Sequence, residues 1–353
     1  MNFSNKESKN KHKTPDCIKV EDLVENIKEV IHETSKKTKK EIEEIDKNLN
    51  EVKKELDSQN TNSSKDSWLK SPNLQLVFNY AKDLSTYSFI KRSVFSALAG
   101  FFVGISYLVY VIIKASFYSN GIAPAPELIA LSNFIGSLMF PFAIFAIIYL
   151  GGNLFTSNSL MYVAVFKKII RIKYFLYQLI LTWFFNFVGS LVMVGISYLI
   201  LWDNLDAQDV AYKIASSKLT TEWWSTLASG FICNIIITGC IYGYKVIPSK
   251  TVGFLFVYLL IVFFALSGFQ HTVANMYIVP LGLSYWQSAT VSAGEAWGAL
   301  FYYNLLPVSF SNTLGGMIIP ILYIVAESKF SVKGFHKKKK VITEIKIKNE
   351  DPN

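Results

Sequence analysis

The sequence contains few of the residues that soluble enzymes use for chemistry. Its 353 residues include three cysteines and four histidines, and these are not spaced as the ligands of a zinc site. It has no glycine-rich phosphate loop and no activated serine or cysteine nucleophile. Three cysteines also provide no disulfide framework. We therefore expect no enzyme, no catalytic residues, no metal site and no cofactor.

Charge is scarce as well, while apolar residues are abundant. Charged residues make up 17% of the chain against 51% hydrophobic and 15% aromatic residues, and the mean hydropathy is positive. This composition is typical of a protein with several membrane spans. The net charge is +9, but residues 1–66 hold fourteen lysines against fifteen acidic residues. The basic excess lies beside the apolar segments, which indicates membrane topology rather than binding to nucleic acid.

Two of the six apolar segments are longer than one membrane span. At about 1.5 Å per residue, more than thirty residues exceed a hydrocarbon core of about 30 Å. Each long segment predicts a broken helix, and the whole predicts an all-α protein that crosses the lipid bilayer six times. The segments cover about residues 93–114, 129–166 (broken), 174–201, 224–246, 252–283 (broken) and 300–326.

Basic residues are distributed unevenly between the two sides that alternating segments define. One side has only Lys114, Lys213 and Lys218, diluted by acidic residues. The positive-inside rule places the other side, and with it both termini, in the cytoplasm of a multi-pass protein of the cell membrane. The basic residues of that side are Lys91, Arg92, Lys167, Lys168, Arg171, Lys173, Lys245, Lys250, Lys329 and the run Lys337 to Lys340.

Polar residues interrupt both long apolar segments. Residues 267–277 form a polar island around His271, and residues 150–158 interrupt the second segment in the same way. Ionisable and amide side chains at membrane depth are costly unless they line a cavity or one another, so they are candidates for a functional site. Hydrogen-bonded packing of a core histidine is the simpler alternative.

The amino-terminal part is polar and rich in lysine and glutamate. Apolar residues at helical spacing over 19–56 predict an amphipathic helix, and its second half has a coiled-coil seam; a solvated helix is the alternative. We expect four regions: a cytoplasmic arm over 1–66, an interfacial helix over 67–90, a six-span channel domain over 91–328 and a basic cytoplasmic tail over 329–353. The seam consists of Ile42, Ile45, Leu49, Val52 and Leu56.

The two halves of the apolar region repeat the same order of features. In each half a broken helix is followed by a motif of asparagine and small residues. Three spans per half predict two inverted repeats whose interrupted helices meet near the middle of the membrane, where freed N–H groups attract anions. We interpret the motifs themselves as close helix packing without a transport role; they contain Asn186, Gly189, Asn312, Gly315 and Gly316.

Residues 151–158, 268–277 and 304–316 resemble the signature segments of the formate/nitrite transporter family. The resemblance covers about residues 75–330. It implies an aquaporin-like bundle of six transmembrane helices and a homopentamer with one pore per protomer. It also implies passage of small monovalent anions, or of the weak acids that these form with protons.

The resemblance also implies which residues form the pore. His271 corresponds to the central histidine, Thr156 to the threonine that faces it, and Lys218 to a basic residue outside the pore. Further pore residues are Asn234, Asn275, Gln270 and Asn153, and the last two replace acids that the family usually has. Constrictions are expected at Phe140, Ile144 and Phe264 on the cytoplasmic side, and at Leu154, Phe155 and Ile237 toward the outside.

Together these features predict a pH-dependent channel or proton-coupled carrier for small monocarboxylates. Formate is the first candidate, followed by nitrite, lactate and hydrosulfide. One alternative is an aquaporin-like channel for neutral solutes such as water. Another is a membrane-anchored scaffold in which the coiled coil is the working part.

Overall fold

The computed structural model describes residues 72–166, 168–285 and 292–326, together with isolated positions between 25 and 50. The described part of 72–326 is helical, with turns, loops and one isolated β-bridge between Ser119 and Ile122. Its helices are α2 (Pro72–Ser85), α3 (Phe89–Ala115), α4 (Pro126–Met139), α5 (Phe142–Leu150), α6 (Phe155–Asn158), η2 (Ser159–Met161), α7 (Tyr162–Phe166), α8 (Ile172–Ile200), α9 (Leu205–Thr220), α10 (Trp223–Val246), α11 (Lys250–Ser267), α12 (Thr272–Ser284), α13 (Ala293–Ala299) and the π-helical turn η3 (Leu300–Leu305), which continues into a helical stretch over 306–326.

Six helical stretches in the described residues are long and apolar enough to cross a membrane, which agrees with the six predicted segments. The two segments predicted to be broken each supply a second, shorter apolar helix, Phe155–Phe166 and Thr272–Ser284. The spans are Phe89–Ala115, Pro126–Leu150, Ile172–Ile200, Trp223–Val246, Lys250–Ser267 and Gly294–Ala326.

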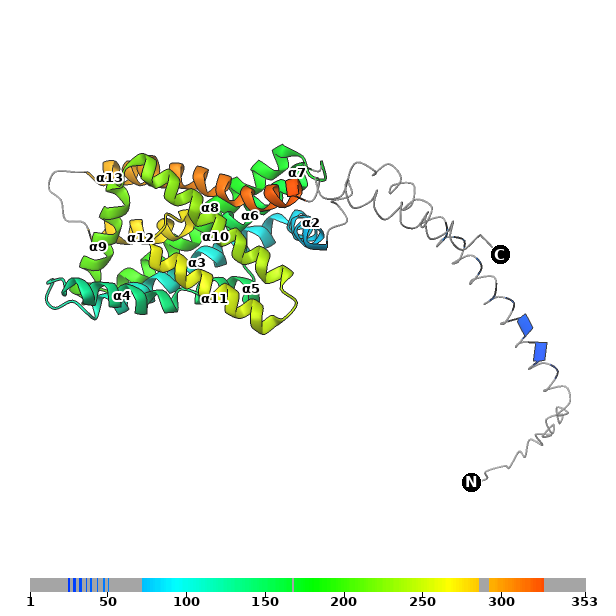
Figure 1. Cartoon of the computed structure of the whole chain (residues 1–353), viewed down its shortest axis with the longest axis horizontal. Coiled ribbons are helices and arrows are strands. Elements are labelled where there is room, and N and C mark those ends of the chain that lie inside the picture. The colour runs from blue at the N-terminus through cyan, green and yellow to red at the C-terminus, as the bar shows by residue number, and fades with distance from the viewer. Residues whose placement is uncertain are drawn as a thin grey trace, which may run out of the picture. The chain divides into compact units, whose positions relative to one another are not determined.

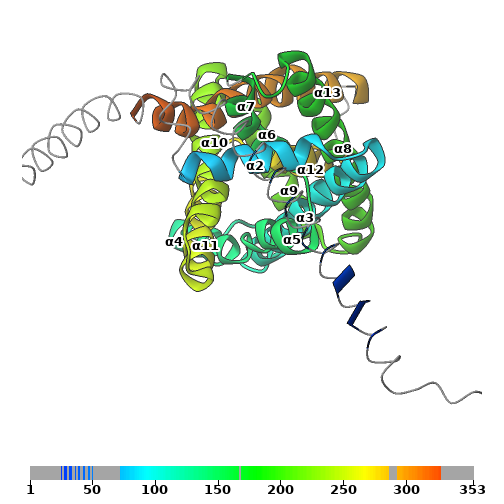
Figure 2. The same ribbon diagram turned by 90° about the vertical axis from the view of Figure 1, so that its right-hand side faces the viewer.

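The two broken segments bring α6 and α12 to the middle of the bundle (Figure 1), and the perpendicular view shows the longer helices around them (Figure 2). Every residue of α12 from Thr272 to Gly282 is buried. The long spans instead carry many exposed apolar side chains, as expected for surfaces that face lipid. The fold therefore encloses α12 and α6 in protein.

Glycine with positive φ ends the first half of each broken segment. Gly151 follows α5 with φ 91°, and Gly268 follows α11 with φ 64° in the left-handed region. Glycine adopts such angles without the steric cost that a Cβ atom adds. The chain then runs irregularly for a few residues before α6 begins at Phe155 and α12 at Thr272. Both breaks lie within the segments in which the sequence predicts them.

Asn186 on α8 holds the first break. Its Oδ1 accepts a hydrogen bond from the Phe155 N–H (2.8 Å), at the start of α6. Its Nδ2 donates to the carbonyl groups of Ser96 (2.6 Å) and Asn153 (2.9 Å). Backbone groups that leave a helix inside a membrane need such partners, because no water can replace them.

Asn312 holds the second break with the same pattern of bonds. Its Oδ1 accepts from the Thr272 N–H (2.9 Å), at the start of α12. Its Nδ2 donates to the carbonyl groups of Gly230 (2.7 Å) and Gln270 (3.0 Å). We call Asn186 and Asn312 the break clamps. The interpretation of these motifs as helix packing alone is therefore incomplete.

The glycines that follow the break clamps serve close helix packing, as the sequence indicates. A Cβ atom on Gly189 would overlap the Ala97 carbonyl of α3, and one on Gly315 would overlap the Phe231 carbonyl of α10. Backbone thus lies against backbone at both crossings, an arrangement that small residues permit between transmembrane helices.

The region before the first span is helical, with a turn inside it. Where an interfacial helix over 67–90 is expected, α2 ends at Ser85 and α3 starts at Phe89. Arg92 joins the two, because its buried guanidinium donates to the carbonyl groups of Leu84 (2.9 Å) and Tyr87 (3.0 Å). The predicted seam from Ile42 to Leu56 lies outside the described residues; the described positions between 25 and 50 are helical and exposed.

Replacing Gly189 by alanine should prevent the close crossing of α8 on α3. The added Cβ meets backbone, which cannot move aside as a side chain could, so we expect the melting temperature of the detergent-solubilised protein to fall by about 5 °C or more. Gly195→Ala on the same helix is the matched control, because a Cβ there meets nothing within 4 Å. Equal melting temperatures for the two variants would contradict this account.

Candidate functional site

His271 and Thr156 meet at the centre of the bundle. Thr156 lies in α6 and His271 directly precedes α12, and the Thr156 Oγ1 and His271 Nε2 atoms are 3.1 Å apart. Both side chains are buried, with exposed fractions of 1% and 4%. The two breaks therefore bring together residues 115 positions apart, as the resemblance implies.

The two ring nitrogens of His271 have different partners. Its Nδ1 accepts a hydrogen bond from the Ala274 N–H (3.1 Å), so the side chain caps the first turn of α12. A nitrogen that accepts cannot carry the proton, and the hydrogen of the neutral ring therefore lies on Nε2. His271 thus donates to the Thr156 hydroxyl oxygen. In this arrangement the imidazole is a hydrogen-bond donor at the start of a helix.

An apolar chamber lies directly beside His271. Its volume is about 30 Å³, which is enough for one or two water molecules. Apart from His271 its lining is hydrocarbon or aromatic, and the rings of Phe140 and Phe264 meet edge to face at one end, with centroids 6.1 Å apart. The lining residues are Val103, Phe140, Ala143, Ile144, Ile147, Leu154, Ile237, Ile261, Phe264 and His271.

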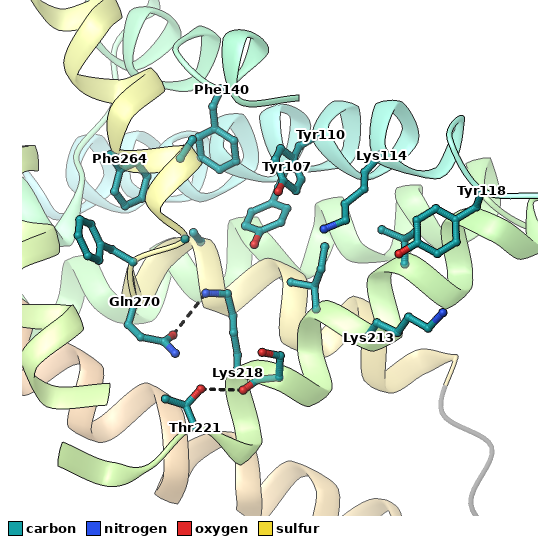
Figure 3. A pocket seen from close by; sticks show the side chains of 17 residues that line it. Tyr107, Tyr110, Lys114, Tyr118, Phe140, Lys213, Lys218, Thr221, Phe264 and Gln270 are labelled. Atoms are coloured by element: carbon teal, nitrogen blue, oxygen red, sulfur yellow. Dashed lines mark hydrogen bonds between the residues drawn. The ribbon is translucent and has the colours of Figure 1, made fainter. Parts of the chain in front are cut away.

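A second and much larger cavity, of about 320 Å³, lies on the other side of Phe140 and Phe264. Lys114, Lys213 and Lys218 line it, and its lining includes no acidic residue. Figure 3 shows the amino groups of Lys114 and Lys218 directed into this space. We call it the cationic cavity.

The position of Phe140 and Phe264 differs from the expected one. They are expected on the cytoplasmic side and Lys218 on the opposite side, yet all three line the cationic cavity. Phe140 directly follows α4 and Phe264 lies in the last turn of α11, so neither ring lies at the start of its span. Ile144, Leu154 and Ile237 line the apolar chamber, whereas Phe155 is buried and lines neither cavity.

Lys218, which the resemblance implies is a basic residue outside the pore, is a buried residue of helix α9. Its exposed fraction is 9%. Its described hydrogen bond is a long one, 3.4 Å from Nζ to the Gln270 Oε1 atom. Desolvation lowers the pKa of Lys218 to about 8. No sequence pattern predicts this burial, because α9 lies between two spans in a polar stretch.

The side-chain oxygen of Gln270 accepts from three donors. Asn275 Nδ2 lies 2.8 Å from this oxygen, Lys218 Nζ 3.4 Å and Asn304 Nδ2 3.5 Å. Such a cluster of donors suits a carboxylate, yet the chain has an amide here, and the charge of Lys218 is not neutralised by it. Asn304 is a member of this group that sequence reasoning missed, although it begins the third segment that resembles the family.

Asn234 and Asn153 stabilise the scaffold around the central pair. Asn234 Nδ2 donates to the carbonyl groups of Thr156 (3.0 Å) and Asn312 (2.6 Å), and so ties α10 to both breaks. Asn153 Nδ2 donates to Thr182 Oγ1 (3.0 Å). Neither residue lines the apolar chamber or the cationic cavity, so both belong to the scaffold behind the residues that line these spaces.

Comparison with known proteins agrees with this architecture. The sequence model of the Formate/nitrite transporter family matches residues 73–326. The chain belongs to this family. It is 27% identical over 265 residues to the formate channel FocA of Haemophilus influenzae, covering 68% of this chain and 89% of that protein. It is also 27% identical over 268 residues to the formate-nitrite transporter of Plasmodium falciparum, covering 71% and 83%.

Solved structures of this family have the same fold. A pentameric formate channel with formate bound aligns with a TM-score of 0.55 at 21% identity, over 68% of this chain and 97% of that one. An FNT family ion channel aligns with a TM-score of 0.57 at 24% identity, over 70% and 94%. The formate/nitrite transporter family comprises membrane transporters and channels, so this chain is a multi-pass transport protein and not an enzyme.

The cap that His271 provides to α12 can be separated from its bond to Thr156. Asparagine is a good N-cap residue and can keep the bond from the Ala274 N–H, but its side chain is too short to reach Thr156. Phenylalanine makes neither of these bonds. We expect His271→Phe to lose about 1 kcal/mol more stability than His271→Asn, measured by thermal unfolding in detergent. Equal stability of the two variants would mean that the cap is not a stabilising contact.

Proposed function

We propose that this transporter is a pH-dependent channel or carrier for small monovalent anions or their conjugate acids, with formate as its first substrate. One observation carries the proposal: a cationic cavity leads through two phenylalanine rings to an apolar chamber that contains one hydrogen-bond donor, His271. The formate-related names of the relatives support the choice of substrate.

The dimensions of the apolar chamber favour the smallest substrates. A space of about 30 Å³ is closest in size to the smallest candidates, which are hydrosulfide, formate and nitrite. Lactate would require Phe140 and Phe264 to move apart. Water would also fit, but an unneutralised Lys218 before the rings favours an anion over a neutral solute.

We infer that the substrate crosses the chamber as a neutral acid. Leaving an anion among apolar groups costs several kcal/mol even after relaxation. Protonating a carboxylate of pKa about 4 at pH 7 costs roughly 4 kcal/mol, and Lys218 concentrates the anion beforehand. Both ring nitrogens of the neutral imidazole already have partners, so His271 does not supply the proton, which comes from solvent in the cationic cavity. A substrate that reaches the ring replaces the Thr156 hydroxyl as the acceptor of the Nε2–H and is thereby oriented.

We propose an aquaporin-like pore built from two inverted repeats. The matching bonds of the break clamps support it, because Asn186 and Asn312 contact equivalent backbone groups in the two halves. The basic residues at one end of the spans support cytoplasmic termini. Following the pentameric relative, we propose a homopentamer, in which the helix expected over 19–56 reinforces the assembly from the cytoplasmic side.

Lys218 should determine how well the substrate is captured. Lys218→Ala should raise the KM for formate flux into proteoliposomes about fivefold, which corresponds to about 1 kcal/mol, with a smaller effect on maximal flux. Lysine is charged below its pKa, so KM should also rise as the pH passes about 8. Lys218→Arg should abolish that rise, because arginine remains charged.

Gln270→Glu should resemble Lys218→Ala, because a carboxylate neutralises the lysine. A KM that none of these changes alters would contradict the proposal.

Formate flux should follow the concentration of formic acid. At a clamped membrane potential we expect flux to rise with falling pH while the acid remains far below saturation. Thr156→Val should reduce formate flux more than Thr156→Ser does, because serine keeps the hydroxyl. Flux that responds to voltage as a full negative charge and ignores pH would exclude neutral crossing. Water flux without formate flux would favour the neutral-solute channel. The absence of both fluxes would favour the membrane-anchored scaffold.

A further inference from the structure

The cationic cavity is far larger than a one-carbon anion requires. Its volume of about 320 Å³ is at the lower end of the range of small-molecule binding sites. We propose that it is a binding site for a small dianion, such as a short dicarboxylate or inorganic phosphate, held between Lys218 and Lys114. The site itself needs only these residues; its effect on transport rests on the function proposed above.

Lys114 is the second cation of this site. It lies near the end of α3 and is half-buried. Its Nζ atom donates to Asn133 Oδ1 (2.8 Å), which also accepts from the Tyr110 hydroxyl (3.1 Å). An ammonium group has three hydrogens, so this bond fixes its position and leaves two hydrogens for a ligand. The Tyr107 hydroxyl lines the same cavity and adds a neutral donor (Figure 3).

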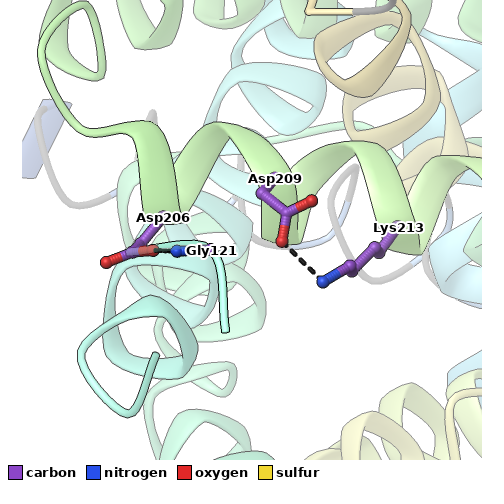
Figure 4. A network of polar contacts seen from close by, with 4 residues as sticks. All are labelled: Gly121, Asp206, Asp209 and Lys213. Atoms are coloured by element: carbon purple, nitrogen blue, oxygen red, sulfur yellow. Dashed lines mark hydrogen bonds and ion pairs between the residues drawn. The ribbon is translucent and has the colours of Figure 1, made fainter. Parts of the chain in front are cut away.

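The third lysine of the cavity is already neutralised. Lys213 Nζ lies 2.6 Å from Asp209 Oδ2, one turn earlier on α9 (Figure 4). Since the lining contains no acidic residue, the charges of Lys114 and Lys218 remain without a carboxylate partner among the described residues. A monovalent anion balances one of them, and a dianion balances both.

A dianion in this position should obstruct transport. Passing the rings of Phe140 and Phe264 as a neutral molecule would require two protonations instead of one, so the dianion binds without crossing. It occupies Lys218, the residue that captures the monovalent substrate, and so competes with it. We therefore expect external dianions to inhibit formate flux.

The binding test compares two ligands of similar size and different charge. Isothermal titration calorimetry of the full-length, detergent-solubilised protein at constant ionic strength should show succinate binding at least tenfold more tightly than monomethyl succinate. Inorganic phosphate, in a parallel titration above pH 7, decides whether the site takes dianions in general or only dicarboxylates. Equal affinity for succinate and its monoester would overturn the proposal.

Variants then locate the site. Lys114→Met should weaken succinate binding about tenfold, and Lys114→Arg should keep it within threefold. The double variant Asp209→Asn with Lys213→Met is the matched control, because it removes a lysine from the same cavity without a change in net charge, and it should bind succinate within twofold of the unmodified protein. If Lys114→Met binds succinate as well as this control does, Lys114 is not part of the site and the proposal is wrong.

The transport test separates this proposal from the previous one. Succinate present on both sides of proteoliposomes should inhibit formate flux competitively, with an inhibition constant that rises about tenfold in Lys114→Met. Succinate binding without any formate flux would refute the proposed function and leave the dianion site standing. Formate flux that saturating succinate does not inhibit would refute the competition proposed here. Should Lys114→Met fail to fold, Lys114→Gln replaces it in both assays.

Discussion

The break clamps are the interaction on which the rest of the structure depends. A helix that is interrupted inside a membrane leaves N–H and C=O groups that neither water nor lipid can satisfy. Asn186 and Asn312 satisfy these groups from neighbouring helices. Asn234 joins the two breaks through the carbonyl groups of Thr156 and Asn312. The irregular segments can therefore occupy the centre of the bundle, where they hold His271 against Thr156.

The clamped breaks also separate two environments that transport requires in sequence. The cationic cavity concentrates anions, because charge attracts over a distance in a partly desolvated space. The apolar chamber rejects charge, because nothing in its lining except His271 can compensate it. Phe140 and Phe264 form the boundary between them. A substrate that can exist as both anion and neutral acid is suited to both environments.

Gln270 gives the cationic cavity its character. Three donors surround its side-chain oxygen, so the surroundings are those of a carboxylate while the residue is neutral. The charge of Lys218 consequently remains available to ligands. Because Gln270 leaves Lys218 charged, the described lining of the cavity contains two uncompensated cations, Lys218 and Lys114. One such cation favours monovalent anions, whereas two in one cavity also accommodate a dianion.

The sequence by itself determined the features that depend on local physics. The number of spans follows from the length of apolar runs, and the breaks at Gly151 and Gly268 follow from polar, glycine-containing interruptions of those runs. The meeting of His271 with Thr156 came from resemblance rather than from spacing. Tertiary structure alone decided that α9 buries Lys218, and that Phe140 and Phe264 lie beside it. Burial and the facing of side chains on separate helices arise from packing between segments distant in the chain, which no local pattern records.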